Sequence, residues 1–499
     1  MATIEGIRIR NYRALKEILI GRTFENQQGI SLPRMIAVIG PNGSGKSTLM
    51  DAFGFIGDCL ISGVEEACEK PGRGGYEKVR TRGQQGPIEF EIYYREEHNS
   101  RPISYSLHID LDSENRPVVA YERLRQRRKG QSRGQPYSFL ELNHGKGSVW
   151  AGEANEEVEG TSKLDIELED ARRLGIASYG NLVDHPRIVA FRSFLEGWYL
   201  SYFVPALARG MPVAGAQKHL NRTGDNLANY VQFMERQQTR RFKEVLERIA
   251  KKIPGVQKIT AERQKDGRLL LQFNDRGFVD PFYAADMSDG TLKMFAYLLL
   301  LEDPEPAPLI GIEEPENGLH HQLLEPLARE MKSYAEKADG PQVLVTTHAT
   351  NFVDALTPEE VWVLQKDEDG FSAIARAADL PNVPQLYAEG IPLGSLWYSN
   401  HFGRGNPGCT LRCSPRGSQM FRRCATCCHA GSDFRKVKIS GFIHIVAKAA
   451  FPKICCRGRT RQTGLCCISY RRNCAVTHIL ARRIASWCWS MRTMTIAAN

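Results

Sequence analysis

The chain has 499 residues, enough for two or three domains or for one large domain with an insertion. Its hydrophobic content of 42% and its charged content of 25% are ordinary for a soluble globular protein. No apolar stretch approaches the roughly 20 residues that a membrane helix needs, and the N-terminus lacks the apolar core of a secretory signal. We therefore expect a cytoplasmic protein without membrane contact.

The net charge of +9 conceals two different compositions. Residues 404–499 contain 18 lysines and arginines, one acid and eleven of the 13 cysteines. Residues 1–403 hold the other 48 basic and 56 acidic side chains, a net charge of −8. The two segments need separate interpretations, and the acidic body gives little support to a large phosphate-binding surface.

A glycine-rich loop follows Met35–Ile39, an apolar run that predicts a buried strand. The sequence GPNGSGKST, residues 40–48, fills every fixed position of GxxxxGK[ST] between this strand and a predicted helix. The glycines let backbone amides surround phosphate, Lys46 reaches the β- and γ-phosphates, and Ser47 offers a hydroxyl to Mg²⁺. This pattern predicts a nucleoside triphosphate site built from Gly40, Pro41, Asn42, Gly43, Ser44, Gly45, Lys46, Ser47 and Thr48.

Residues 61–275 predict an α+β insertion. Period-two alternation in 87–94 and 103–111 predicts strands. The span 229–255 predicts one amphipathic helix ending at Pro-Gly, and its length favours packing on the core over a coiled coil. The basic, glycine- and serine-rich span 123–135 predicts a solvated loop, with contact to DNA phosphates as the alternative.

Two further motifs lie close together after the insertion. The segment SDGT, residues 288–291, places a hydroxyl and a glycine at the start of a predicted helix. About twenty residues later the apolar run Leu309–Ile312 ends in Glu313 and Glu314. Adjacent carboxylates repel each other unless a cation lies beside them. At the end of such a strand, the first would bind Mg²⁺ through water and the second would orient the attacking water.

In this order the motifs resemble those of the RecF/SMC/OLD-like branch of ABC-type ATPases, which are AAA family proteins, over about residues 1–403. Residues 288–291 are similar to the ABC signature, normally LSGGQ. The segment EEPENGLHH, residues 313–321, resembles the Walker B motif and D-loop of OLD-like bacterial ATPases, although most ABC-type ATPases have Asp at the first position. His348, after the predicted strand Val343–Val345, matches the switch histidine, which contacts the γ-phosphate.

The resemblance implies an α/β P-loop NTPase of the ABC-ATPase head type that uses ATP and Mg²⁺. It makes Glu314 and His348 catalytic and gives Glu313 and Ser47 to the metal. It also implies a homodimer, in which Ser288 and Gly290 of one protomer cap the ATP of the other. The D-loop segment 317–320 would cross the dimer interface, and either Gln84 or Gln85 is the candidate for the Q-loop.

The expected head consists of residues 1–60, with the P-loop, and 276–403, with the signature, the acidic pair and the switch histidine. Residues 61–275 form the insertion between them. OLD nucleases continue with a Toprim nuclease domain, for which too few residues remain here before the composition changes. Any nuclease-like effector would therefore be a separate polypeptide.

Two functions remain open for such a head. The first is an ATP-gated dimer that hydrolyses ATP and controls a partner effector, in bacterial anti-phage defence. The alternative is a RecF-like DNA-binding ATPase in repair or recombination, which the acidic body favours slightly less. A transporter subunit is disfavoured, because 242 residues separate Lys46 from Ser288.

The tail, residues 404–499, has the composition of a wrongly read frame, with one acid where average usage gives roughly a dozen. We expect it to be frameshifted or disordered. The alternative is a zinc- or nucleic-acid-binding appendage, since Cys424 and Cys427 form a CxxC pair, although the remaining paired cysteines are adjacent doublets unlike those of zinc ribbons.

Overall fold

The computed structural model describes residues 2–26, 29–128, 136–150, 163–237, 239–253, 255–403, 436–439 and 442–445. The chain divides into two compact units, residues 1–410 and 411–499. In the second unit the described residues form an antiparallel hairpin of β18 (Lys436–Ile439) and β19 (Phe442–Ile445). The tail, residues 404–499, was predicted to be frameshifted or disordered, or alternatively to bind zinc or nucleic acid. Apart from this hairpin, the tail lies outside the described residues.

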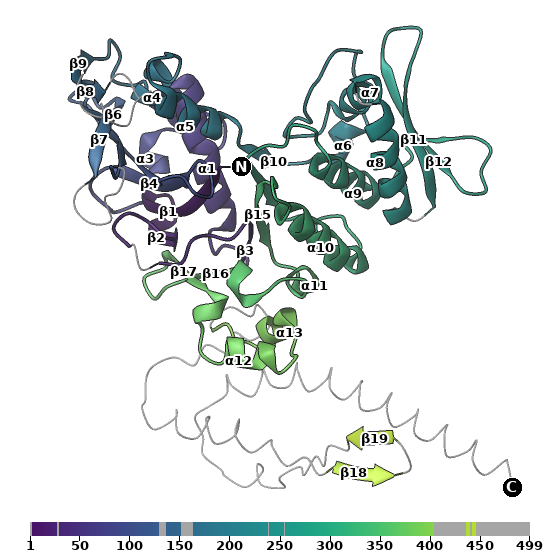
Figure 1. The fold of residues 1–499 in the computed structure, drawn as a ribbon. Coiled ribbons are helices and arrows are strands. Elements are labelled where there is room, and N and C mark those ends of the chain that lie inside the picture. Colours follow the sequence, from purple (N-terminus) through teal and green to yellow (C-terminus); the bar gives the residue numbers. More distant parts are fainter. Residues whose placement is uncertain are drawn as a thin grey trace, which may run out of the picture. The chain divides into compact units, whose positions relative to one another are not determined.

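A six-stranded sheet in the first unit carries the P-loop strand (Figure 1). Its strands pair in parallel, except that β17 runs antiparallel to β16. In spatial order the strands are β10 (Tyr199–Ser201), β14 (Leu309–Glu313), β15 (Gln342–Thr347), β3 (Met35–Ile39), β16 (Val361–Lys366) and β17 (Ser372–Arg376).

Both faces of this sheet are covered, as the apolar run in β3 requires. Met35, Ala37 and Ile39 belong to one hydrophobic core, which also contains residues of α9 (Asp289–Leu301) and α10 (Leu324–Ala335). Ile36 and Val38 belong to a second core with residues of α1 (Lys46–Ser62). Side chains alternate between the faces of a strand, so a strand buried on both sides is apolar throughout. The predicted α/β class is confirmed.

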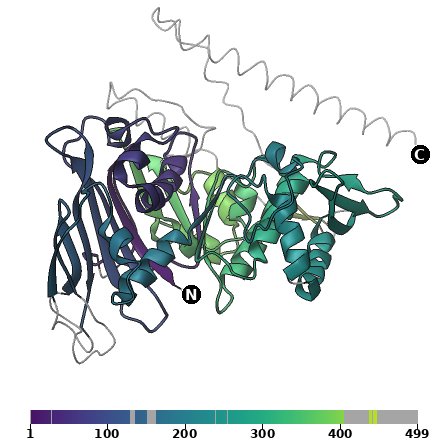
Figure 2. The same ribbon diagram turned by 90° about the horizontal axis from the view of Figure 1, so that it is seen from above.

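An eight-stranded antiparallel sheet joins the N-terminal strands to strands of the predicted insertion (Figures 1 and 2). Its order is β2 (Leu15–Gly21), β1 (Thr3–Tyr12), β4 (Ile88–Arg95), β5 (Ile103–Leu111), β6 (Pro117–Gln126), β7 (Tyr137–Asn143), β8 (Lys146–Trp150) and β9 (Lys163–Glu167). The basic span 123–135 was predicted to be a loop. This prediction is wrong for residues 123–126, which form the end of β6.

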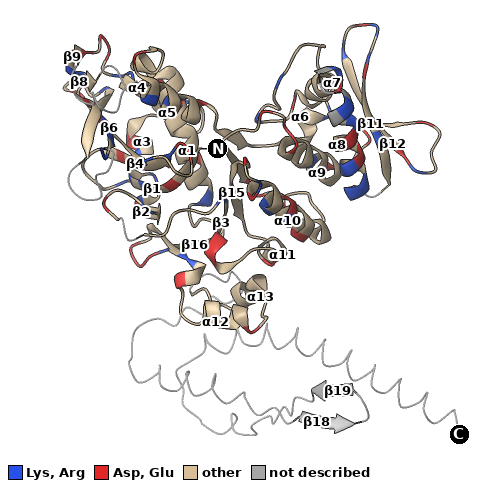
Figure 3. Ribbon diagram, viewed as in Figure 1, with Lys and Arg blue, Asp and Glu red and all other residues tan. Residues whose placement is uncertain are grey.

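The span predicted as one amphipathic helix is helical on both sides of residue 238, as α7 (Leu227–Gln237) and α8 (Thr239–Lys252), and residue 238 lies outside the described residues. Their apolar faces enter the same core as α9 and α10. A three-stranded antiparallel sheet of β11 (Val256–Arg263), β12 (Leu269–Asp275) and β13 (Phe282–Tyr283) follows. In Figure 3, basic and acidic residues are interspersed along the helices and strands of the first unit.

The remaining elements are short and connect these layers. The helices are α2 (Val64–Glu69), α3 (Tyr76–Val79), α4 (Gly175–Tyr179), α5 (Pro186–Glu196), α6 (Pro205–Ala208), α11 (Thr350–Val353), α12 (Val383–Ala388) and α13 (Leu393–Tyr398). Single 3-10 turns lie at His321–Leu323, Pro358–Glu360 and Ala377–Asp379. Among the described residues, no helix combines the length and apolar character needed to cross a membrane.

Glu122 is a fully buried carboxylate on β6. It accepts hydrogen bonds from the backbone N–H groups of Gly175 at 2.5 Å and Ile176 at 3.1 Å, and from the Tyr105 hydroxyl at 3.1 Å. Burial raises the pKa of Glu122 to about 7, although the hydrogen bonds from Gly175 and Ile176 oppose the rise. Glu122 therefore joins α4 to the sheet and binds its proton more tightly in the folded state.

We expect this carboxyl group to destabilise the fold as the pH rises from about 4.5 to about 7, since its folded pKa lies above its ordinary value of 4.5. Between these values the unfolded chain releases the proton that the folded chain retains. The free energy of unfolding of wild type, minus that of E122Q, should fall by up to about 3 kcal/mol across this range. Urea unfolding at pH 4.5 and 7.5 measures it, and a constant difference would contradict the prediction.

Candidate nucleotide-binding site

Three strand ends bring the predicted motifs to one edge of the six-stranded sheet. β15 lies between β14 and β3, and Thr346 pairs with both Glu313 and Val38. The carboxyl ends of parallel strands meet at the same edge of a sheet. The segments that follow these strands carry the P-loop, the acidic pair and His348, so residues far apart in the sequence become neighbours.

The P-loop, residues 40–47, connects β3 to α1. Gly43 and Gly45 have φ angles of +79° and +110°, a conformation that residues with a Cβ rarely adopt. A Cβ on Gly40 would lie 2.1 Å from the carbonyl oxygen of Leu364 on β16. The backbone therefore requires glycine at all three positions, whatever the loop binds.

Lys46 is the first residue of α1, and its side chain turns back into the P-loop. Its Nζ donates to the carbonyl oxygens of Gly40 at 2.8 Å and Pro41 at 3.3 Å, and lies 4.0 Å from Glu314 Oε1. The side chain is 4% exposed. Burial lowers the pKa of Lys46, against the attraction of nearby carboxylates, chiefly Glu314. An anion in the loop would be a stronger partner for this ammonium than two neutral carbonyls.

Glu314 occupies a strained turn directly after β14. Its φ of +41° is unusual for a residue other than glycine. Its N–H donates to the Thr346 carbonyl at 2.8 Å, and its Oε2 accepts from Asn317 Nδ2 at 3.0 Å. Its Oε1 lies 4.0 Å from Lys46 Nζ and 3.6 Å from His348 Nδ1. The structure thus brings three of the predicted site residues together around one carboxylate oxygen.

A pocket of about 550 Å³ opens beside these groups. Ser47, Glu313 and Glu314 line it, and hydroxyl and carboxylate oxygens are ligands that Mg²⁺ accepts. Within the described ranges, no three histidine, cysteine or carboxylate side chains converge as a metal-binding cluster.

The predicted signature lies at the start of α9. Ser288 caps this helix, since its Oγ accepts from the Thr291 N–H at 3.1 Å. A Cβ on Gly290 would lie 2.7 Å from the carbonyl oxygen of Gly318, so α9 and the acidic loop are in close contact there. Asp289 lines the pocket of its own chain, whereas Ser288 and Gly290 do not. The role of these two residues toward a second protomer stays a prediction.

Two charged residues of this region, Glu316 and Lys293, are not among the predicted site residues. Glu316 Oε1 accepts from the His348 N–H at 2.6 Å and lies 3.0 Å from His348 Nδ1. Lys293 Nζ donates to the Asn317 carbonyl at 2.8 Å. Burial lowers the pKa of Lys293, and the charge of Glu316 is the largest opposing influence. Two features of the sequence could have identified these residues: a lysine inside an apolar helix, and a third carboxylate in the segment EEPENG.

The two glutamines considered for the Q-loop lie before β4. Gln84 donates its backbone N–H to the Thr81 carbonyl at 3.2 Å, and the Gln85 carbonyl accepts from Asn11 Nδ2 at 3.2 Å. Neither lines the pocket beside the P-loop. The assignment of either glutamine to the Q-loop stays a prediction.

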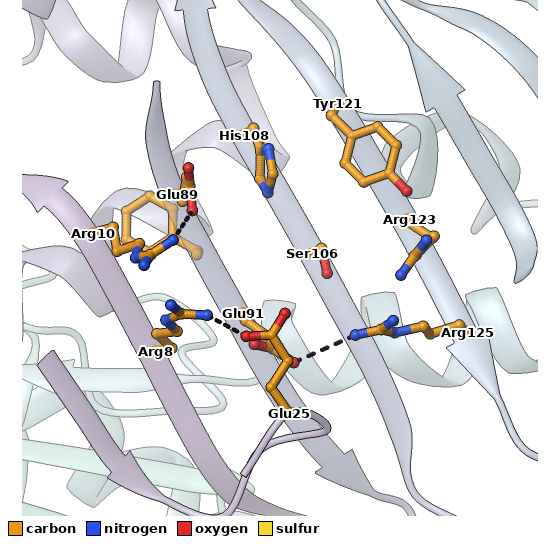
Figure 4. A pocket seen from close by; sticks show the side chains of 11 residues that line it. Arg8, Arg10, Glu25, Glu89, Glu91, Ser106, His108, Tyr121, Arg123 and Arg125 are labelled. Carbon is orange, nitrogen blue, oxygen red and sulfur yellow. Dashed lines mark hydrogen bonds and ion pairs between the residues drawn. The ribbon is translucent and has the colours of Figure 1, made fainter. Parts of the chain in front are cut away.

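A second hollow, on one face of the eight-stranded sheet, is strongly charged (Figure 4). Its charged side chains are Arg8, Arg10, Arg123, Arg125, Glu25, Glu89 and Glu91. Arg8 pairs with Glu25 at 2.5 Å, and Arg125 lies 3.7 Å from Glu91. Four guanidinium groups opposed by three carboxylates leave little net charge, whereas a nucleic-acid surface depends on an excess of positive charge. We therefore place the candidate site at the P-loop.

Residues 35–354 match the model of a family described as "AAA domain, putative AbiEii toxin, Type IV TA system". The chain belongs to this family. The matched span contains the P-loop, the acidic pair and His348. Membership confirms the predicted ABC-type head of an AAA family ATPase and the P-loop NTPase fold.

Solved structures of SMC heads are similar to the chain at low sequence identity. One is an SMC head bound to the C-winged helix domain of ScpA, with 13% identity and a TM-score of 0.44, covering 74% of this chain and 97% of that one. Another, from Thermotoga maritima, has 14% identity and a TM-score of 0.37, covering 75% and 98%. An Smc head with an extended coiled coil, bound to the C-terminal domain of ScpA and derived from Pyrococcus furiosus, has 14% identity and a TM-score of 0.43, covering 78% and 99%. No curated protein sequence matches the chain.

We expect G290A to destabilise the protein by about 1–3 kcal/mol, because the added methyl group must displace the backbone at Gly318. Thermal or urea unfolding of the full chain measures this. The matched control is G57A in α1, where a Cβ meets no atom within 4 Å and alanine favours the helix by about 1 kcal/mol. Equal stability of G290A and G57A would show that α9 and the acidic loop are not in close contact.

Proposed function

We propose that the chain binds and hydrolyses ATP with Mg²⁺, and that ATP joins two copies into a dimer that controls a partner effector. One observation carries this proposal. Glu314 Oε1 lies 4.0 Å from Lys46 Nζ and 3.6 Å from His348 Nδ1, so residues from three segments of the chain meet at one carboxylate oxygen. Membership of an AAA family supports the nucleotide-binding part.

The P-loop fits a triphosphate because its lysine and one of its hydroxyls lack strong partners. Lys46 donates only to neutral carbonyls, and the buried Oγ of Ser44 has no hydrogen-bond partner in the described part of the chain. Phosphate oxygens would satisfy both groups. Ser47 and Glu313 would hold Mg²⁺, which when bound offsets the negative charge of the phosphates.

Glu314 is the best-placed base for hydrolysis. Asn317 donates to its Oε2, which leaves Oε1 to orient the attacking water and accept its proton. Lys46 would stabilise the charge that develops on the transferred phosphate. His348, 3.6 Å from the same Oε1, would donate a hydrogen bond to the γ-phosphate and so detect whether it is present.

The effector part of the proposal rests on the family. Its description names an AbiEii toxin of a type IV toxin–antitoxin system, which supports a role in which this head acts with a partner, as anti-phage defence would require. The effector would be a separate, nuclease-like protein. The charge balance of the hollow in Figure 4 does not favour the alternative, a RecF-like DNA-binding ATPase.

We expect E314Q to lower ATP turnover at least 100-fold, since it removes the base, while ATP affinity changes little. In contrast, K46A should lose ATP binding itself, because the P-loop loses its only lysine. Phosphate release gives the turnover, and calorimetry with ATP and Mg²⁺ gives the affinity. Near wild-type turnover in E314Q would end the assignment of Glu314.

With ATP and Mg²⁺ the E314Q protein should accumulate as a dimer, because hydrolysis no longer releases the second copy. Light scattering should show a doubling of mass that depends on ATP. A bulky signature variant, S288R, should remain monomeric while its own P-loop still binds ATP. A monomeric E314Q protein with ATP bound would contradict the dimer and leave the ATPase proposal intact.

A further inference from the structure

Glu316 is an interior carboxylate in the acidic loop, two residues beyond Glu314. Its side chain is 7% exposed. Its Oε2 is buried and has no hydrogen-bond partner in the part of the chain that the structure describes. Unsatisfied buried polar atoms are costly and concentrate where function requires them. A carboxylate in this position therefore needs an explanation beyond the folding of the loop.

We propose that Glu316 is the positioning residue for His348, holding the imidazole so that Nε2 is the nitrogen that meets the γ-phosphate. This inference rests on the proposed ATPase function. It assigns a role to a residue that lies outside the P-loop, the acidic pair and the signature. Glu316 acts through the histidine and does not itself touch the nucleotide.

One oxygen of Glu316 contacts His348 twice. Oε1 accepts from the backbone N–H at 2.6 Å and faces ring Nδ1 at 3.0 Å. Backbone and ring are thus fixed to the same atom, which limits rotation of the side chain. A carboxylate at Nδ1 keeps a proton on that nitrogen, as the partners of functional histidines commonly do. A ring protonated on both nitrogens then donates from Nε2 to the γ-phosphate. Glu314 Oε1 lies farther from Nδ1, at 3.6 Å, so Glu316 is the closer partner.

The charge of Glu316 is compensated by two buried lysines. Its attraction opposes the lowering of the pKa that burial imposes on Lys46 and on Lys293. Lys293 also donates to the carbonyl of Asn317, the next residue in the loop. These lysines lie on α1 and α9, so positive charge from both the P-loop helix and the signature helix offsets the charge of Glu316.

The test compares wild type, E316Q, H348A and the double variant E316Q/H348A as full chains. Glutamine keeps the size and an acceptor oxygen but loses the charge that fixes the ring. E316Q should lower kcat about tenfold with little change in KM, because the histidine acts on the γ-phosphate during turnover. In the H348A background, E316Q should change kcat less than twofold, since its effect passes through the histidine.

Glu360 provides the matched control. Its side chain is 9% exposed, against 7% for that of Glu316. It accepts from one backbone N–H, that of Thr357, and pairs with one cationic side chain, that of Lys332. E360Q should leave kcat and KM unchanged. If E316Q does not fold, E316D serves in its place, because the shortened carboxylate withdraws from both nitrogens of His348.

Two outcomes separate the failures. Equal losses from E316Q in the wild-type and H348A backgrounds, or a kcat equal to that of E360Q, would overturn the role of Glu316 while turnover itself remains. A wild-type chain that binds ATP and Mg²⁺ without turnover would overturn the proposed ATPase. Conversely, a tenfold loss that disappears in the H348A background supports both.

Discussion

The insertion of β15 between β14 and β3 is the constraint on which the geometry of the site depends. The pairing continues past the strands: Glu314, one residue beyond β14, donates its N–H to Thr346 at 2.8 Å. Glu316 then accepts from the N–H of His348 at 2.6 Å. The loop after β14 is therefore bonded to the end of β15 and to the backbone of the loop that follows β15. A shift of one residue in this register would turn alternate side chains to the opposite face and separate Glu314 from His348.

The local chemistry of the P-loop made its residues predictable. Gly40, Gly43 and Gly45 are required by their own backbone geometry, and a run of five apolar residues directly before a glycine-rich loop is typical of a strand buried on both faces. Such requirements are expressed within a few positions of the chain. For that reason the strand, the loop and the helix that begins at Lys46 follow from the sequence directly.

Contacts between distant residues could not be predicted in the same way. Glu316 lies 32 positions from His348, and Lys293 lies 24 positions from Asn317. Their roles depend on side-chain directions that only the assembled sheet and α9 determine. A similar limit applies to β6, where Leu124 is buried while Arg123 and Arg125 face the hollow of Figure 4. The basic composition there obscured the period-two alternation that identifies a strand.

The charges around Glu314 also suggest why nucleotide binding and hydrolysis would be coupled. Glu314 Oε1 lies 4.0 Å from Lys46 Nζ, and the attraction between them opposes the lowering of the pKa that burial imposes on Lys46. Phosphate in the P-loop would take the lysine as its partner and repel the carboxylate. Glu314 would then retain Asn317 on Oε2 and offer Oε1 to water. Under the proposed function, the carboxylate that balances the charge of Lys46 would thus act as the base when phosphate occupies the P-loop.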